Sequence, residues 1–229
     1  SARGEAAAAA RRKVGAFALT GGPEGRDAFR IACTAKDSRH SRWDLTLHVP
    51  VDLAMEIENF AGDLEVSGRQ AAVSLTDQAG NVRVSQCRGP VTVRNSAGNI
   101  EVSSVPGEVA VSASAGEIIL KDLRGRVRAD NSAGNITVRE AKSDDLRLTN
   151  SAGNIEVGLA GPFTGRLFAH SGAGNVTVSV PRGARCRVKA HAGLGQVTNS
   201  LPSGITAGNP PGLLEASTSM GNVEITAAE

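Results

Sequence analysis

The sequence predicts an all-β protein in which one chain winds into a parallel β-solenoid, also called a β-helix. One observation is an alternating polar and apolar run, such as NIEV at Asn99–Val102, that follows a recurring glycine. Another is a composition with 27 Gly, five Phe, one Trp and no Tyr, which suits a narrow aliphatic core better than a helical bundle. The recurring glycines are Gly62, Gly80, Gly98, Gly116, Gly134, Gly153, Gly174, Gly195 and Gly221.

The spacing of these glycines fixes the winding. A second series of short strands lies between them, beginning near Pro90, Glu108 and Arg126, so that each repeat of about 18–21 residues holds two strands and two turns. Equivalent residues recur in register only if the chain returns to the same place, so successive coils pair as parallel strands roughly 4.8 Å apart. We expect about nine coils over roughly 40 Å. Right-handed winding is expected, because parallel crossovers default to it.

A left-handed hexapeptide helix, the alternative with 18 residues per turn, needs an aliphatic residue at every sixth position. Counting from Ile100, that rule falls on Pro106 and Ser112 and therefore fails.

The columns of the solenoid follow from its period. Cys87, Val105 and Leu123 share one inward corner position, so Cys87 is expected to be a small core residue. Asparagines after the corner glycine form one predicted ladder from coil to coil, and those before it form another. The first ladder is Asn81, Asn99, Asn135, Asn154, Asn175 and Asn222, and the second is Asn95, Asn131 and Asn150. The predicted inward pairs are Ile100/Val102, Val109/Val111, Ile118/Leu120, Val127/Ala129, Ile136/Val138, Leu146/Leu148, Ile155/Val157 and Val176/Val178.

Residues 1–42 do not follow the repeat and are predicted to be an N-terminal tail and capping segment, and residues 43–229 form the solenoid. Ser1–Lys13 has a helix-forming composition, whereas Gly15–Gly21 and Asp27–Ala35 are predicted strands. A cap is expected there because a solenoid end exposes unpaired strand edges. At the other end the chain finishes soon after a regular strand, so the C-terminal coil is expected to lie open. The widest repeat contains a Pro- and Gly-rich surface loop, Asn199–Gly212.

Tandem phrases of the form G-[N/D]-[I/V/L]-x-V, introduced by LTLHVPVDLAMEIENFAGDLEV, resemble the adhesin-like family of bacterial β-strand-repeat domains, a domain of unknown function. The resemblance covers roughly Trp43 to Ala227, and VSVPRGARCRVKA repeats its Val-Pro lead-in. It implies an exported or cell-surface bacterial protein and brings no catalytic motif with it. Bactofilin-like scaffold solenoids are the next nearest resemblance.

Calcium binding in glycine-rich β-rolls requires repeated GGxGxD carboxylates. In this chain the corresponding position is asparagine in six repeats and aspartate only at Asp63, so a structural ladder is favoured and no cofactor or metal is expected. His170 and His191 each lie four residues before a corner glycine and are expected to stack on adjacent coils, about 5 Å apart. Two imidazoles alone make an incomplete metal site, so exposed corner histidines are the favoured interpretation.

No catalytic residues are predicted, and the chain is not expected to be an enzyme. The outward Glu101 and Glu156 are about 14 Å apart by the strand spacing, too far for a pair of glycosidase carboxylates of the retaining type. Cys87 and Cys186 lie too many coils apart to form a disulfide.

The strongest binding signal is a predicted arginine stripe on one face of consecutive coils. A polyanion such as an acidic polysaccharide or a phosphate polymer could bind there, and a solvated face is the favoured alternative. Nucleic acid is the less favoured polyanion because aromatic interleaving is limited to Phe168. The predicted stripe residues are Arg126, Arg128, Arg147, Arg166, Arg185 and Arg187.

The net charge of +2 names no partner, and no run approaches the roughly 18 apolar residues of a membrane helix. The chain starts at Ser1, which leaves room for a removed leader. The predicted function is a non-catalytic, adhesin-like or structural solenoid that is periplasmic, on the cell surface or extracellular. The alternatives are a scaffold subunit that stacks end to end as a homo-oligomer and a polyanion-binding module. Other envelope proteins are further expected partners.

Overall fold

The computed structural model describes residues 17–24, 28–35, 46–161, 163–182, 184, 186–201 and 212–228, the first two ranges by their backbone alone. The chain divides into two compact units, Ser1–Ala54 and Met55–Glu229. The segment with helix-forming composition, residues 1–13, lies outside the described residues, and so does most of the predicted loop, residues 202–211.

The first unit contains an antiparallel pair of strands, β1 (Phe17–Glu24) and β2 (Ala28–Ala35). Phe17 is the register partner of Ala35, and Glu24 that of Ala28. The two strands predicted in this segment are therefore present, and they form a hairpin of their own.

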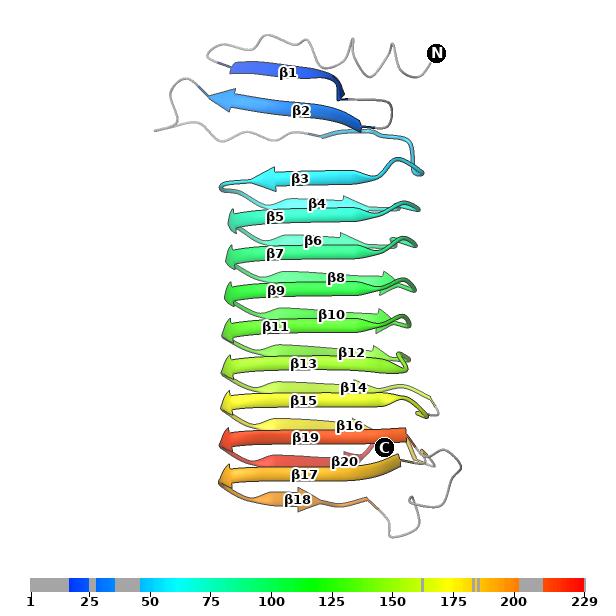
Figure 1. Ribbon diagram of the computed structural model, residues 1–229, viewed down its shortest axis with the longest axis vertical. Coiled ribbons are helices and arrows are strands. Elements are labelled where there is room, and N and C mark those ends of the chain that lie inside the picture. The colour runs from blue at the N-terminus through cyan, green and yellow to red at the C-terminus, as the bar shows by residue number, and fades with distance from the viewer. Residues whose placement is uncertain are drawn as a thin grey trace. The chain divides into compact units, whose positions relative to one another are not determined.

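The second unit is a parallel β-solenoid, which confirms the predicted fold class (Figure 1). Each coil contributes one strand to each of two nine-stranded sheets, and every pairing within these sheets is parallel. The first sheet contains, in spatial order, β3 (Met55–Asn59), β5 (Val73–Ala79), β7 (Val91–Ala97), β9 (Val109–Ala115), β11 (Val127–Ala133), β13 (Asp145–Ala152), β15 (Arg166–Ala173), β19 (Gly212–Met220) and β17 (Cys186–Leu194). The second contains β4 (Leu64–Ser67), β6 (Val82–Ser85), β8 (Ile100–Val105), β10 (Ile118–Leu123), β12 (Ile136–Ala141), β14 (Ile155–Leu159), β16 (Val176–Val180), β20 (Val223–Ala227) and β18 (Val197–Asn199).

The core is a narrow aliphatic column between the two sheets. Every inward pair predicted from the sequence is buried, as with Ile100 and Val102, which are both fully shielded from solvent. Cys87, Val105 and Leu123 fill one corner with no exposed surface, so the predicted core role of Cys87 is confirmed. Cys87 and Cys186 are free thiols, as their separation in the stack requires. Burial raises the pKa of both thiols, because a thiolate would lose its hydration in this apolar interior.

The NSAGN phrase forms the other corner. Gly98 has a φ of +125°, and a Cβ atom added there would lie 1.9 Å from the carbonyl oxygen of Gly80 in the preceding coil. Only glycine allows this conformation and this close approach. The side chains of the two asparagine ladders then join coil to coil: the backbone N–H of Asn99 donates to Oδ1 of Asn81 at 3.1 Å, and Nδ2 of Asn95 donates to Gly80 O at 2.8 Å.

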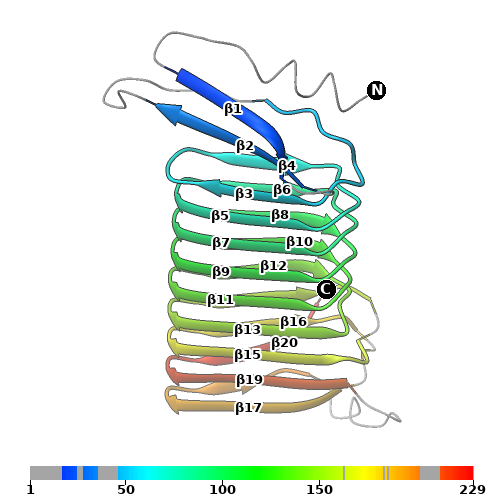
Figure 2. The same cartoon turned by 45° about the horizontal axis from the view of Figure 1, so that its top comes forward.

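The order of coils departs from the sequence-based expectation at one end. The coils from β3–β4 to β15–β16 follow chain order, but β19–β20 then lies between β15–β16 and β17–β18 (Figures 1 and 2). The prediction that the C-terminal coil lies open at the end of the stack is therefore wrong. Among the described strands, the coil at this end of the stack is β17–β18, and the C-terminal coil pairs on both sides.

The physical reason lies in the inward positions of the two coils. Asn199 of β18 is aligned with Ile225 of β20, which is fully buried. An asparagine at that position inside the stack would lose its hydration without a matched partner. At the end of the stack Asn199 stays exposed, and the apolar Leu214 and Ile225 complete the core instead.

Candidate functional site

The predicted arginine stripe lies on the outward face of the first sheet, and part of it comes together as expected. Arg128 of β11 is the register partner of Arg147 of β13, and Arg147 that of Phe168 in β15. The guanidinium carbon of Arg147 lies 5.1 Å from the centre of the Phe168 ring, a cation–π contact.

Acidic residues interrupt this stripe. Asp145 is aligned with Arg166 and binds Nε of Arg126 through Oδ2 at 3.1 Å. Asp130 accepts a hydrogen bond from Nε of Arg128 at 2.7 Å. Two of the predicted stripe residues therefore already have anionic partners, which reduces the positive charge that this face offers to a polyanion.

The order of the coils also breaks the stripe at its far end. Leu213 of β19 lies between Arg166 and Arg187, and Glu215 lies between Phe168 and Lys189. Arg187 thus belongs to the column of Arg126 and Arg166 rather than to that of Arg128 and Arg147. Arg185 lies outside the described residues. A hollow of about 580 Å³ surrounds this break, and it is lined by Asp144, Asp145, Thr164, Gly165, Arg166, Arg187 and Leu213.

On the second sheet, Glu101 joins three coils. Its carboxylate accepts a hydrogen bond from Nζ of Lys121 at 2.7 Å and another from Nε of Arg83 at 3.2 Å. The hydrogen bond from Lys121 is the largest influence and lowers the pKa of Glu101, although partial burial opposes the change. Glu101 and Glu156 are separated by Ile119 and Thr137 in the same column.

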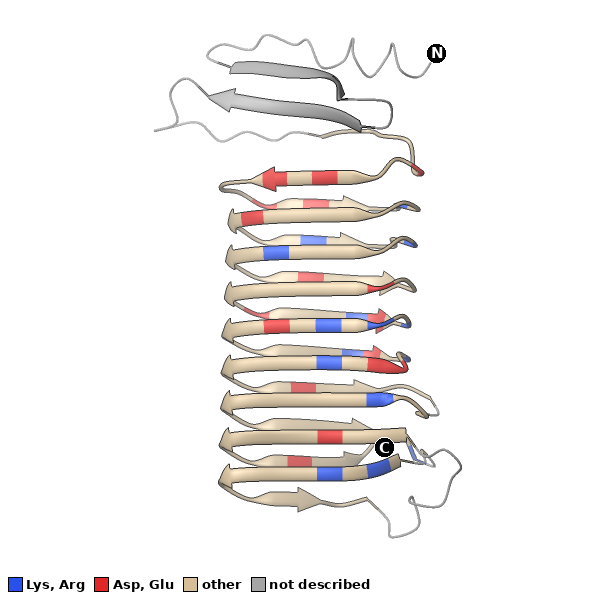
Figure 3. Ribbon diagram, viewed as in Figure 1, with Lys and Arg blue, Asp and Glu red and all other residues tan. Residues whose placement is uncertain are grey.

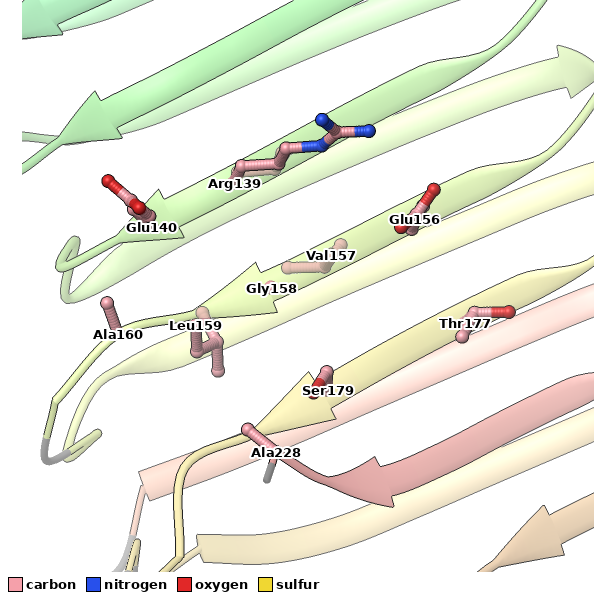
Figure 4. Close-up of a pocket in the computed structure, with 11 residues that line it drawn as sticks. Arg139, Glu140, Glu156, Val157, Gly158, Leu159, Ala160, Thr177, Ser179 and Ala228 are labelled. Carbon is pink, nitrogen blue, oxygen red and sulfur yellow. The ribbon is translucent and has the colours of Figure 1, made fainter.

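A second hollow, of about 320 Å³, lies farther along this sheet (Figure 4). The small side chains of Ala160, Ser179 and Ala228 leave it open, and Gly158 contributes no side chain to it. Arg139, Glu140 and Glu156 supply its charged groups, so it combines one cation with two anions and selects neither sign of ligand.

The predicted stacking of His170 on His191 is wrong. Ser217 of β19 lies between them: it is the register partner of His170 on one side and of His191 on the other. Nδ1 of His170 lies 2.9 Å from Oγ of Ser217, in hydrogen-bonding distance. The inserted coil therefore separates the two imidazoles by about twice the strand spacing.

Sequence reasoning missed one buried acid. Asp77 of β5 occupies the asparagine ladder between Asn59 and Asn95 and is 1% exposed. Burial raises the pKa of Asp77, and the hydrogen bond from Nδ2 of Asn59, at 2.9 Å, opposes that change. The signal was visible in the 18-residue spacing of Asn59, Asp77 and Asn95.

Among the described residues, no group of three or more His, Cys, Asp or Glu side chains could hold a metal ion. Nor is any helix in the described part of the chain long and apolar enough to cross a membrane.

The two ends of the stack carry opposite charges (Figure 3). β3 at one end presents Glu56 and Glu58, which are exposed. β17 at the other end presents Arg187, Lys189 and His191, which are also exposed. Beside the basic strand, Leu194 is 71% exposed and Val197 is 44% exposed, so this open coil also offers apolar surface.

Comparison with known proteins identifies the repeat. Residues 44–226 match the model of the Toastrack DUF4097 family. No curated protein matches the chain, and no solved structure does. The family match supports the predicted resemblance to a repeat domain of unknown function, whereas the adhesin-like activity stays a prediction.

Proposed function

The chain belongs to the Toastrack family of repeat domains, and we propose that it is a non-catalytic, adhesin-like structural module of a bacterial cell envelope. In this role the solenoid is a rigid rod exported to the periplasm or the cell surface, and its partners are copies of itself or other envelope proteins. The polar and charged side chains of the module serve mainly to hold neighbouring coils together.

The observation that carries the proposal is that five of the eight residues of the NSAGNIEV phrase hold the coil together. Asn95 is buried and donates to the preceding coil, Gly98 closes the corner, and Asn99 both donates to the preceding coil and accepts from the next. Ile100 and Val102 fill the core. A sequence that repeats such a phrase specifies length and stiffness, because each coil is held by its neighbours.

The charged side chains support the same interpretation. Glu101 links β6, β8 and β10 through Arg83 and Lys121, and Arg126, which directly precedes β11, pairs with Asp145 of β13. Opposite charges on neighbouring strands stabilise the sheet, typically by about 0.2–1 kcal/mol per pair. These charged side chains have partners on neighbouring coils, so they stabilise the stack and are less available to bind a ligand.

Location can be tested by labelling intact cells of the source bacterium with a membrane-impermeant maleimide. Glu156→Cys places a thiol on an exposed position in the middle of the second sheet, whereas Cys87 and Cys186 are buried. We expect labelling of the Glu156→Cys protein without lysis, above the background of the native chain. Labelling that requires lysis of the inner membrane would contradict an envelope location.

The structural role has a separate test in the same cells. The readout is whichever property distinguishes cells that contain the protein from cells that lack it. Substitutions on the exposed faces, such as Glu156→Cys, should preserve that property, whereas the corner substitution Gly134→Ala should abolish it. Loss of the phenotype with a folded Glu156→Cys protein would point to ligand chemistry on that face.

Polyanion binding stays the second prediction. It is tested by the salt concentration that elutes the protein from immobilised heparin, comparing the native chain with a variant carrying Arg147→Ala and Arg166→Ala. Equal elution of the two proteins would remove the arginine stripe from consideration.

A further inference from the structure

The two ends of the solenoid are edges of the same two sheets. In the second unit as described, β3 and β4 are the edge strands at one end, and β17 and β18 are those at the other. Edge strands present backbone N–H and C=O groups to an incoming strand, so each end can template another coil.

The register of the first sheet relates the two ends residue by residue. Following the partners from β3 to β17 across the sheet, Met55, Glu56, Ile57 and Glu58 occupy the columns of Val188, Lys189, Ala190 and His191. If β3 of a second copy followed β17 in this register, Glu56 would lie beside Lys189 and Glu58 beside His191. The partly buried Ile57 would extend the apolar column at Ala190.

The corner of the last coil is also complementary to the corner of the first. Gly221 N donates to Leu194 O and Val223 N to Gln196 O, so the next donors in the stack are Gly195 and Val197. The acceptor of Gly195 N on a second copy would be Ala61 O. A Cβ atom at each later corner glycine, Gly195 and Gly221 included, would strike the preceding coil's carbonyl, but at Gly62 it would meet nothing within 4 Å. The first corner therefore has the glycine that a preceding coil requires, and no atom lies within 4 Å of the Cβ position of that glycine.

Charge distinguishes this arrangement from its alternative. Head-to-head pairing would place β17 beside β17 of the second copy, with Arg187 and Lys189 of both copies on adjacent strands. Like charges on adjacent strands are destabilising, whereas opposite charges stabilise the pairing. The acidic β3 and the basic β17 visible in Figure 3 therefore fit a head-to-tail contact.

We propose that β17–β18 of one copy binds β3–β4 of a second copy as the next coil, which gives head-to-tail oligomers held by continuous parallel sheets. Glu56 and Lys189 set the polarity of the contact. The inference rests on the proposed structural role, because it names the partner of the rod, but its test requires no cell and no knowledge of location.

The first experiment is sedimentation velocity of the full chain over a range of concentrations. We expect oligomers that increase with concentration. Glu56→Lys and Lys189→Glu should each weaken the association about tenfold, because each turns an attractive cross-strand pair into a repulsive one. The double variant should restore the native behaviour. Glu156→Lys, a charge change in the middle of the second sheet, is the matched control and should leave the association unchanged.

The second experiment fixes the polarity by disulfide trapping. A mixture of Glu56→Cys and Lys189→Cys chains should form mixed disulfide dimers under mild oxidation, because register partners lie within disulfide reach. Disulfide dimers from the Lys189→Cys chain alone would reveal head-to-head contact and overturn the proposal. A monomer at every concentration would also overturn it, and would indicate that residues 1–54 or another partner occupy the β3 edge. Neither result would alter the labelling test of envelope location.

Discussion

Replacing the corner glycine Gly134 with alanine tests the central contact of the solenoid. The added Cβ atom would lie 2.0 Å from the carbonyl oxygen of Gly116 and 2.8 Å from its carbonyl carbon. Real carbon–oxygen contacts of this kind are about 3.3–3.6 Å, so the two coils would have to move apart by more than about 1 Å at the corner. That movement would break the hydrogen bond from Gly116 N to Ala133 O, which is 3.0 Å long.

The expected loss of stability follows from three contributions. Alanine at a φ of +120° is strained by about 1–3 kcal/mol. Overpacking against backbone costs about 1–3 kcal/mol, and the broken hydrogen bond about 1 kcal/mol more. We therefore expect Gly134→Ala to lower the free energy of unfolding by about 5 kcal/mol.

Gly62→Ala is the matched control. Gly62 has a comparable φ of +111°, but a Cβ atom there meets no other atom within 4 Å, so only the strain of about 1–3 kcal/mol applies. The assay is urea unfolding followed by far-UV circular dichroism, at a concentration low enough to keep the chain monomeric. If the two variants lose the same free energy, conformation alone requires glycine and the proposed contact between coils is refuted.

Three further substitutions have defined outcomes. Asn150→Ala removes the hydrogen bond from Nδ2 to Gly134 O and should cost about 1–3 kcal/mol in urea unfolding, whereas the exposed neighbour Ser151→Ala should cost almost nothing. Asp77→Asn should stabilise the fold at neutral pH by about 1 kcal/mol, because it removes a buried carboxylate whose pKa burial has raised. That gain should be complete above the raised pKa and should vanish as the pH falls below the ordinary value of 3.8, where the carboxyl is protonated in both states. Glu101→Gln should cost at most about 1 kcal/mol at neutral pH, and this cost should disappear as the pH falls from the ordinary pKa of 4.5 through the lowered pKa of Glu101.

Each of these three predictions can fail in its own way. An Asn150→Ala protein as stable as the native chain would mean that the buried ladder contributes no net stability. A gain from Asp77→Asn that persists at low pH would trace the effect to packing rather than to charge. A cost of Glu101→Gln that is unchanged in high salt would argue against an ionic contribution from Arg83 and Lys121.

The repeat allowed most of the fold to be predicted, because period and register carry strong physical constraints. A glycine and an alternating strand that return in phase put Val109, Val127 and Leu146 in one column, and the structure buries all three. The same reasoning gave the corner of Cys87 and the two asparagine ladders. It failed for His170 and His191, because it assumed that coils stack in chain order.

The candidate binding face could be predicted only in part for the same reason. Arg128 and Arg147 lie on consecutive coils in chain order, and the structure brings them together. The ion pairs with Asp130 and Asp145 depend on side-chain reach, which a strand pattern does not specify. The column of Arg187 could be predicted only by knowing which coil pairs with β15, and the loop lengths do not decide that.

The sequence by itself thus determined the coil, its corners and its core, because only one kind of winding keeps identical residues in register. The order of the last coils was decided by the tertiary structure. Parallel coils of equal register present the same hydrogen-bonding edge, so either β17–β18 or β19–β20 could pair with β15–β16. Burial decides which of the two coils pairs there. With β19–β20 in that place, Leu214 and Ile225 fill the interior, and Asn199 remains hydrated at the end of the stack. That choice leaves the basic β17 as the edge strand of the first sheet in the described part of the chain.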